Sequence, residues 1–440
     1  MSQNLEKIAE GYIRALINRS LVMVGQRRYA GEVKTCRIHD LLHVFCVRKT
    51  KTQNFLELVR GYDEGLTFDE PYNPRRLSIQ AQPKHFIKSR IICPQIRSLL
   101  YSSRDFGVRQ LGCNFPFIFL LKLLRVLDLE NICLGSALPR ELWSLVQLRY
   151  LAVLGWLKNG IPFSLENLSN LETFLVRTKD DVGLSLLQDT LLKMKKLRHL
   201  HVYGALIDIR LANDNLESSS ILNNLDTFST MKLYLGQHME KMIRKFPNIR
   251  QLKCCLVEST EYTIDSNRVM VMNFLSHLES LKLNLGKVTM HCVELYLPSS
   301  LQKLTLEEFS WCIISTIGKL PNLQVLRLYR QADGEEKQDS QDMENSEEME
   351  DMEEEIFFPK LKFLKLKSLK IVRWKGLGHC FPSLEKLGLD DCKKLQKLPS
   401  CLGESPLKLS EVHRCPNLDR NSFEGSEEQQ MDYGNMDLKI

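Results

Sequence analysis

This chain of 440 residues lacks the features that would place it outside the cell or in a membrane. No Cys-x-x-Cys pair occurs among its thirteen cysteines, and no charged segment followed by an apolar run comes after Met1. We therefore expect free thiols in a reducing compartment and a cytoplasmic location. The longest apolar stretch, residues 115–121, is far below the roughly 18 residues of a membrane-spanning helix.

The sequence also lacks a recognisable site for catalysis. No Gly-x-x-x-x-Gly-Lys-Ser/Thr loop is present, so the amides and lysine that cradle phosphates in that motif are absent. His39 and His43 have the spacing of zinc-protease ligands, but the acid between them is Asp40 rather than glutamate and no third ligand follows nearby. No nucleophile stands beside a base in a strained turn. These absences predict a protein that is not an enzyme, with no metal site and no small-molecule substrate.

The chain contains many copies of the sequence motif Leu-x-x-Leu-x-Leu, which we call the leucine phrase. With other apolar residues allowed, it starts at 74, 96, 124, 148, 171, 197, 225, 249, 278, 301, 323, 361, 384 and 407. Twelve of the thirteen gaps lie within the roughly 20 to 29 residues of a leucine-rich repeat. The starts at 74, 225 and 407 fit poorly, because polar residues or proline occupy or adjoin their apolar positions.

The repeats predict an α/β fold, a leucine-rich-repeat solenoid shaped as a horseshoe with a parallel concave sheet. The leucines of each phrase should point into a core shared with neighbouring repeats, while the residues between them face outward. Returning segments are expected at residues 138–148 and 161–171. Cys392 and Cys415 lie three residues past the last leucine, where a turn residue is expected, so we predict a structural role for them.

A smaller domain is predicted in front of the repeats. Residues 4–18 and 39–49 have helical periodicity, and strand-like runs occupy 20–24 and 33–38. Helix, hairpin and helix together suggest a winged-helix-like domain. We therefore divide the chain into residues 1–60, a linker at 61–73, the solenoid at 74–418 with an inserted loop at 331–356, and a disordered tail at 419–440.

The inserted loop is strongly acidic. Residues 333–355 contain thirteen Asp and Glu against one lysine, so the formal net charge of +6 divides into −12 in this segment and +18 elsewhere. One hypothesis is that the loop screens a basic face of the solenoid, because tethered opposite charges meet at high effective concentration. The alternative is a solvated low-complexity loop.

Outward positions of the strands supply the candidate protein-binding residues. They form a basic stripe with one exposed aromatic side chain in the second half of the sheet. The candidates are Tyr150, His199, His201, Lys253, Lys282, Lys303, Arg327, Phe363, Lys365 and Lys386. Solenoids bind partners on such faces, so we expect this stripe to be the interaction surface.

The run Cys36-Arg-Ile-His-Asp-Leu-Leu42, followed about thirty-five residues later by repeats, resembles plant intracellular disease-resistance proteins. These are the coiled-coil, NB-ARC (nucleotide-binding), leucine-rich-repeat receptors, and the similarity is greatest to the late-blight resistance type of nightshade plants. The Met-His-Asp signature of the family stands here as residues 38–40. Only the end of the NB-ARC winged helix and the repeats are recognisable, so we expect a truncated product, a fragment or a partial gene model.

The resemblance implies a set of roles. His39 would contact ADP and Asp40 would hold the helix start, but only if an upstream nucleotide-binding module is present. This chain alone should hold no cofactor, although the full-length family binds ADP and ATP. The repeats would recognise a pathogen effector or a guarded host protein and would hold the NB-ARC module inactive, in a pathway leading to the hypersensitive response.

Two other classes of function stay open. A repeat-containing adaptor of a ubiquitin ligase would need an F-box-like helical motif near the N-terminus, where a hairpin is expected instead. A winged-helix regulator that binds nucleic acid would use the basic residues around Arg27 and Arg28, yet the apolar second helix leaves few side chains to read bases. We therefore expect a protein partner rather than nucleic acid.

Overall fold

The structure is a computed structural model of the whole chain. It describes residues 5–27, 33–60, 74–80, 95–102, 120–135, 138–155, 161–178, 184–210, 221–234, 237–257, 269–286, 294–331, 358–372, 381–398, 402, 405–419 and 429–430. Two compact units are present, one of residues 1–158 with 167–179 and one of 159–166 with 180–440. Each unit is described by itself.

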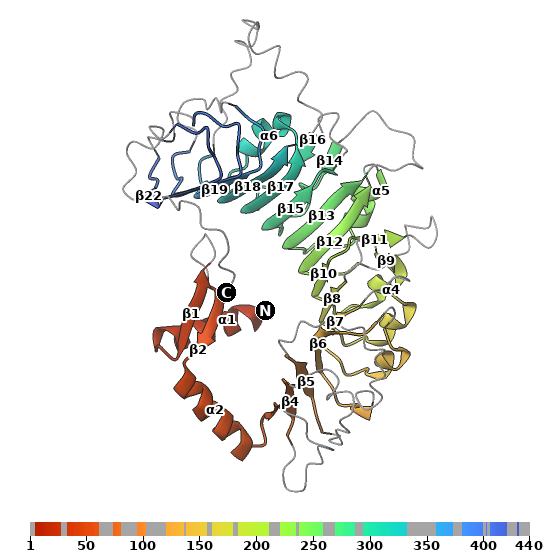
Figure 1. Ribbon diagram of the computed structural model, residues 1–440. Coiled ribbons are helices and arrows are strands. Elements are labelled where there is room, and N and C mark those ends of the chain that lie inside the picture. The colour runs from red at the N-terminus through yellow and green to blue at the C-terminus, as the bar shows by residue number, and fades with distance from the viewer. Residues whose placement is uncertain are drawn as a thin grey trace, which may run out of the picture. The chain divides into compact units, whose positions relative to one another are not determined.

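The first unit begins with the predicted helix, hairpin and helix. Helix α1 spans Leu5–Asn18, strands β1 (Val22–Arg27) and β2 (Val33–Ile38) pair antiparallel, and helix α2 spans Asp40–Thr52. These elements are drawn in red and orange in Figure 1. The winged-helix-like arrangement predicted from the sequence is therefore confirmed.

Several apolar side chains of these two helices are exposed, which differs from expectation. No side chain of α2 is buried, and its apolar Leu41 and Phe45 are 77% and 61% exposed. Tyr12 on α1 is 70% exposed. The periodicity correctly indicated helices, but the described chain covers their apolar stripes only in part, with Leu42 and Cys46 half-buried.

A parallel sheet follows in the first unit. Its strands are β3 (Glu57–Val59), β4 (Arg76–Ile79), β5 (Ser98–Tyr101), β6 (Val126–Cys133), β7 (Tyr150–Leu154) and β8 (Thr173–Arg177), each paired with the next. The sheet thus starts one strand before the first leucine phrase, within the range assigned from sequence to the winged-helix domain. The expected linker at 61–73 lies outside the described residues.

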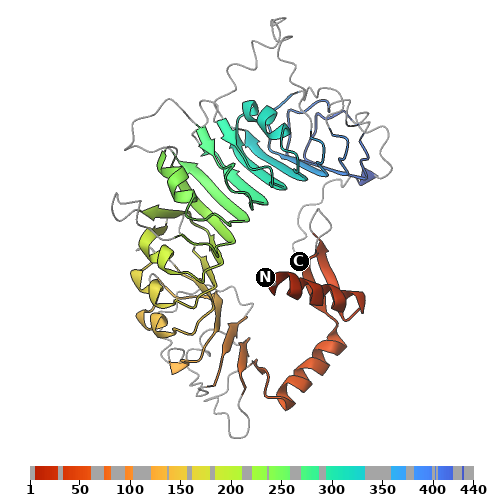
Figure 2. The same cartoon turned by 180° about the vertical axis from the view of Figure 1, so that it is seen from behind.

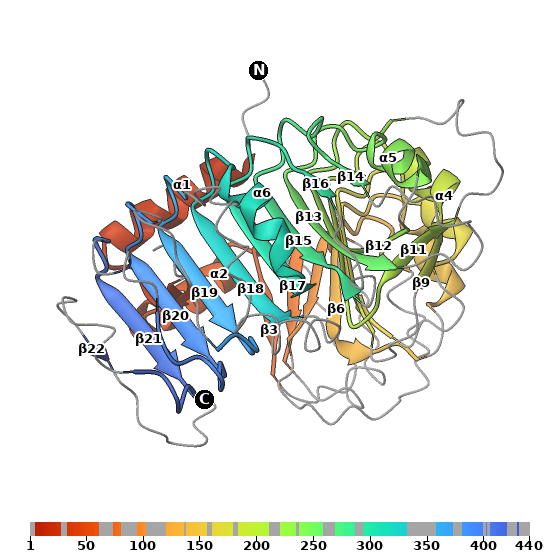
Figure 3. The same cartoon turned by 90° about the horizontal axis from the view of Figure 1, so that it is seen from above.

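The second unit continues the same architecture. Its main strands are β10 (His199–Tyr203), β12 (Thr227–Tyr234), β13 (Gln251–Val257), β15 (Ser280–Asn284), β17 (Lys303–Phe309), β18 (Val325–Gln331), β19 (Phe363–Lys367), β20 (Lys386–Asp390), β21 (Leu409–His413) and β22 (Gln429–Gln430). Each pairs in parallel with the next. Figure 3 shows strands β17 to β21 running side by side in one direction. Strand β22 lies in the range expected to be a disordered tail.

Short elements return the chain between strands. They are η2 (Arg140–Ser144), η3 (Phe163–Asn167), β9 (Leu184–Leu187), α4 (Gln188–Lys193), β11 (Ile207–Arg210), α5 (Gln237–Ile243), β14 (Val269–Val271), β16 (Glu294–Tyr296), η6 (Trp311–Ile313) and α6 (Ile314–Gly318). In the second unit, α4, α5 and α6 lie on the side away from the main strands (Figures 1 and 2). Among the described residues of this unit, no helix lies on the other side of the sheet.

The leucines of the phrase form the core. Leu127 and Leu304 have no exposed surface, and in the return segments Leu145 and Leu168 are also fully buried. Even the three poorly fitting phrases form strands, namely β4, β12 and β21. The predicted solenoid is therefore confirmed.

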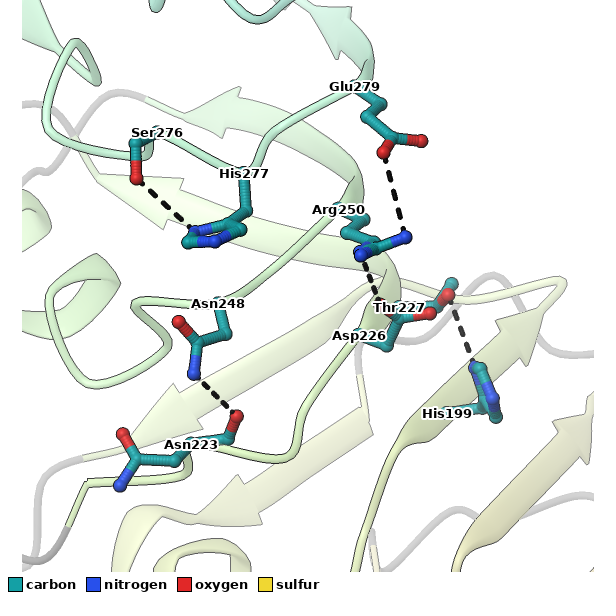
Figure 4. A network of polar contacts seen from close by, with 9 residues as sticks. All are labelled: His199, Asn223, Asp226, Thr227, Asn248, Arg250, Ser276, His277 and Glu279. Carbon is teal, nitrogen blue, oxygen red and sulfur yellow. Dashed lines mark hydrogen bonds and ion pairs between the residues drawn. The ribbon is translucent and has the colours of Figure 1, made fainter. Parts of the chain in front are cut away.

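A ladder of turn residues was missed in the sequence. The asparagine directly before the first leucine of a repeat donates its side-chain amide to a carbonyl oxygen in the preceding repeat. The pairs are Asn170 with Val146, Asn224 with Lys195, Asn248 with Asn223 (Figure 4), Asn322 with Ser299 and Asn417 with Lys393, at 2.7 to 3.0 Å. These bonds satisfy carbonyls that the turns leave unpaired. The recurrent Asn-Leu dipeptide was the signal that could have revealed them.

The two cysteines predicted to be structural lie at strand ends. Cys392 is completely buried, and its Sγ lies 3.7 Å from the carbonyl oxygen of Asp390. Cys415 repeats the arrangement one repeat later, with its Sγ 3.3 Å from the carbonyl oxygen of His413. Equivalent positions in successive repeats thus bind the backbone in the same way.

One repeat departs from regularity. A bulge at Ser229 and Thr230 interrupts the pairing of β12 with β13, and Thr230 has a φ of 65°. Ser229, expected to face outward, is 1% exposed, and its Oγ accepts a hydrogen bond from the Val202 amide at 3.0 Å. The extra residue rotates Ser229 into the core, where the hydrogen bond offsets the cost of burying its hydroxyl.

Candidate protein interface

The strands of the second unit bring the predicted basic residues into register. Lys253 pairs with Lys282, and two strands further Arg327 pairs with Lys365. Thr305 and Gly388 occupy the same row, while Lys303 and Lys386 lie in the adjacent row. We call Lys253, Lys282, Lys303, Arg327, Lys365 and Lys386 the basic stripe. Residues up to 133 positions apart in the sequence are thus aligned by strand pairing alone.

Acidic side chains interrupt the basic stripe. The Lys282 Nζ lies 2.7 Å from Glu307 Oε1. Near the other end, burial would raise the pKa of Asp390, but the hydrogen bond from Lys367 at 2.7 Å and the nearby charge of Lys365 lower it below its usual value. Since these acids come from the next outward row, part of the positive charge of the stripe is neutralised within the sheet.

Phe363 is not the exposed aromatic side chain that the sequence predicted. It is 3% exposed, and the guanidinium carbon of Arg327 lies 5.5 Å from the centre of its ring. An arginine from the adjacent strand covers the outward ring, because long side chains of neighbouring strands meet across a sheet face. Phe363 therefore supports the stripe instead of offering an aromatic surface.

The histidines of β10 form a stack at the start of the second unit. The rings of His199 and His201 are parallel with centroids 6.2 Å apart, and Tyr203 continues the stack at 6.3 Å. Burial, then the charges of His199 and Lys253, lower the pKa of His201 to about 4. His201 is therefore neutral near pH 7 and contributes hydrogen-bonding and ring surface rather than charge.

Tyr150 lies in the other unit from the remaining candidates. It is half-buried on β7, in register with Val126 and Thr173. In the neighbouring row of that unit, burial raises the pKa of Asp128, although the hydrogen bond from the backbone amide of Glu130 acts in the opposite direction. In the described strands of the first unit, the row of Asp128 also holds Ser78, Leu100, Ala152 and Leu175, so it contains no basic residue.

His39 and Asp40 are placed at the start of α2. The Nδ1 of His39 accepts a hydrogen bond from the Leu41 amide at 3.2 Å, so His39 caps the helix, and Asp40 is its first residue. The capping role expected for Asp40 is therefore performed by the histidine. Both side chains are exposed, and two residues at an open helix start do not by themselves fit a nucleotide, which needs several converging amides and charges.

In the part of the chain that the structure describes, no group of three or more His, Cys, Asp or Glu side chains could hold a metal ion. The described helices include none with the length and apolar character required to cross a bilayer.

Another column of charged residues was missed by sequence reasoning. It consists of the residue directly after the first leucine of each phrase. In the second unit this column alternates in sign from Arg198 to Glu279, is neutral at two glutamines, and alternates again from Lys362 to Lys408. Arg250 lies between Asp226 at 3.4 Å and Glu279 at 3.6 Å (Figure 4). Further along, Lys408 contacts Glu385 at 3.3 Å. Aligning the residue directly before each strand, in addition to the outward residues within the strand, would have revealed this column of charges.

Comparisons with known proteins define the class. Residues 95–315 match a leucine-rich repeat region, and residues 1–46 match the winged helix domain of disease resistance proteins. The chain therefore belongs to the leucine-rich-repeat proteins that carry a disease-resistance winged helix. A leucine-rich-repeat protein of Leptospira interrogans is a similar solved structure, with a TM-score of 0.38, 16% identity, and coverage of 85% of this chain and 88% of that one.

The particular relatives are late blight resistance proteins of Solanum demissum. The chain is 34% identical to the homolog R1B-16 and 33% identical to resistance protein R1-A, over its full length in each case. It spans 33% and 34% of those two proteins, about a third of their length. The late-blight type inferred from residues 36–42 and the repeats is thus confirmed.

Proposed function

We propose that this chain is a non-enzymatic recognition module of plant defence whose basic stripe binds a protein partner. The partner would be a pathogen effector or a guarded host protein with an acidic surface. The observation that carries the proposal is the register that aligns Lys253, Lys282, Arg327 and Lys365 on one uncovered sheet face. Such an array attracts an acidic surface over several ångströms, and its long side chains adapt to it.

The winged-helix-like region has a second role in this proposal. Its exposed Tyr12, Leu41 and Phe45 form apolar surface that a further protein module would bury. We propose a cytoplasmic, nucleotide-binding module as that partner, held inactive by the repeats. His39 and Asp40 would contribute to ADP binding only in its presence.

The stripe is tested by a charge-neutral variant and a matched control. The test variant carries Lys253→Gln, Lys282→Gln and Lys365→Gln. The control carries Lys393→Gln, Lys394→Gln and Lys397→Gln, which removes the same charge from a turn of the same unit where all three residues are exposed. Native pull-downs from Solanum demissum leaf extract, with and without pathogen challenge, identify retained proteins, and titration of each purified protein gives its affinity.

We expect the stripe variant to lose at least about tenfold in affinity for the authentic partner, or about 1.4 kcal/mol. The control should change it by less than about twofold. Equal losses in the two variants would show that net charge alone is responsible. In a separate experiment, Leu41→Ser with Phe45→Ser should weaken capture of a purified nucleotide-binding module of the disease-resistance family.

A further inference from the structure

Two cysteines of the second unit occupy the same turn position in successive repeats. Cys392 follows strand β20 and Cys415 follows strand β21, each two residues beyond the last residue pair of those strands. The residue before each cysteine has a left-handed backbone, with a φ of 57° at Asp391 and 53° at Arg414. In both turns the cysteine Sγ lies near the carbonyl oxygen two residues earlier. The chain therefore makes the same turn twice and places the two thiols side by side.

The two thiol groups interact directly. A side-chain hydrogen bond joins Cys392 and Cys415. Neighbouring strands of a sheet lie about 4.8 Å apart, and the Cα atoms of a disulfide lie about 4.4 to 6.8 Å apart. The backbone of the two turns is therefore already spaced for a disulfide. Cys254 and Cys255 differ, because successive residues of one strand point to opposite faces of the sheet.

The hydrogen bond between the two sulfurs also makes one of them reactive. It is the main cause that lowers the pKa of Cys392 to about 7, and it raises the pKa of Cys415. The negative charge belongs to the pair, because one shared proton lies between the two sulfurs. Cys392 is completely buried and Cys415 is half-buried, so an oxidant from solvent meets the sulfur of Cys415 first. A thiolate is the form that reacts.

We propose that Cys392 and Cys415 are a site of reversible oxidation, at which a peroxide closes a disulfide between two successive repeats. The Cys415 thiolate attacks one peroxide oxygen, the O–O bond breaks, and hydroxide leaves behind a sulfenic acid. The Cys392 sulfur then attacks the sulfur of the sulfenic acid. The S–S bond forms as the S–O bond breaks, and the oxygen leaves as water with the Cys392 proton. The two sulfurs lose the two electrons that the peroxide gains, and a dithiol reductant reverses the reaction.

The disulfide strengthens a weakly paired part of the sheet. Strand β21 pairs with β20 from Leu409 to His413, but with β22 only at Ser410 and Glu411. A repeat is stabilised by its neighbours, so a repeat with little pairing on one side opens more readily than one paired fully on both. A covalent bond from Cys415 to Cys392 restrains that opening. The site is independent of the proposed recognition function, and either can fail without the other.

The test uses the full reduced chain with and without hydrogen peroxide. After free thiols are blocked with N-ethylmaleimide, trypsin digestion without reductant places the two cysteines in separate peptides, 387–393 and 415–420. Mass spectrometry detects whether these peptides are joined, and hydrogen exchange follows the amides of β21. Cys415→Ser and Cys392→Ala are the test variants. Cys255→Ser is the matched control, because Cys255 is also a half-buried thiol of the second unit.

We expect peroxide to join peptides 387–393 and 415–420 in the native chain and in Cys255→Ser, and a dithiol reductant to separate them. Oxidation should slow exchange of the β21 amides at least about fivefold in those two chains and leave it unchanged in both test variants. Should Cys392→Ala unfold, Cys415→Ser alone decides, since its side chain is only half-buried. The proposal is overturned if the two peptides stay separate, if either is joined mainly to another cysteine, or if oxidation slows exchange equally in Cys415→Ser.

Discussion

The residue after the first leucine of each repeat has the same backbone role in both units but a different pattern of charge. In the first unit, four consecutive positions are arginine, and they are linked amide to carbonyl at 2.8 Å. In the second unit, the same ladder carries Arg198, Asp226, Arg250, Glu279 and Gln302 in turn. The repeat fixes the backbone position of this residue, but it does not determine the charge of its side chain. Among the described residues, Arg250 of the second unit pairs with two acids of its column, whereas in the first unit Arg149 pairs with Glu172.

The largest expected effect tests whether the two units are energetically separate. Leu127 and Leu304 occupy the same inward position, and neither has exposed surface. Leu127→Ala and Leu304→Ala should each destabilise by about 2–5 kcal/mol. The chain has four tryptophans, so Trp156→Phe and Trp374→Phe leave Trp143 as reporter of the first unit and Trp311 as reporter of the second. Urea unfolding should then show each leucine substitution lowering mainly the midpoint of its own unit, because repeats contact their neighbours. Equal shifts at both reporters would remove the distinction between the units.

A smaller effect concerns pH and the second unit. The folded pKa of His201 is about 4, below the roughly 6.5 of an unfolded histidine. Between these values the unfolded chain binds a proton that the folded chain does not, so stability falls as pH drops from about 6.5 to 4. His201→Gln should remove this component, on the order of 1 kcal/mol after allowance for partial exposure. Titration of the His201 ring near pH 6.5 by NMR would contradict the prediction.

The smallest expected effect is a change in melting temperature on replacing the arginine after the first leucine of a repeat, and its sign should differ between the two units. Arg125→Gln relieves repulsion from Arg97 and Arg149, so it should raise the melting temperature slightly. Arg250→Gln leaves Asp226 and Glu279 without their shared cation, so it should lower it. Both changes should stay below about 1 kcal/mol and shrink in 0.5 M salt, because these groups are at the surface. Calorimetry at low and high salt measures both, and shifts of the same sign would show that the columns do not differ.

Apolar periodicity predicted the secondary structure of both the winged-helix region and the repeats, but it predicted burial only in the repeats. An apolar spacing predicted both α2 and the inward leucines. Leu304 is fully buried, whereas Leu41 is 77% exposed. Spacing identifies the side of an element that can be buried, but burial itself requires a second surface. The repeats provide that surface to one another, whereas the described chain covers α2 only in part: Leu42 and Cys46 are half-buried, but Leu41 is not.

The repeat motif did not predict the burial of side chains at irregular positions. The bulge at Thr230 moves Ser229 from the outward row into the core, and the ring of Phe363 is covered by Arg327. Both outcomes depend on which residue of the adjacent strand lies at the same register position. A single phrase contains no information about its neighbour, so neither burial could be inferred from the phrase alone.

The amino-acid sequence alone determined the repeat, the parallel solenoid and the alignment of Lys253, Lys282, Arg327 and Lys365, because a fixed phrase length places equivalent residues at equivalent heights. Only the tertiary structure decided which charges are neutralised. The distances from Lys282 to Glu307 and from Arg250 to its two acids arise from side chains on different strands. The exposure of Arg75, Arg97 and Arg125 likewise depends on the neighbouring strands. Electrostatic pairing falls off over a few ångströms, and those separations are set by packing rather than by position in the chain.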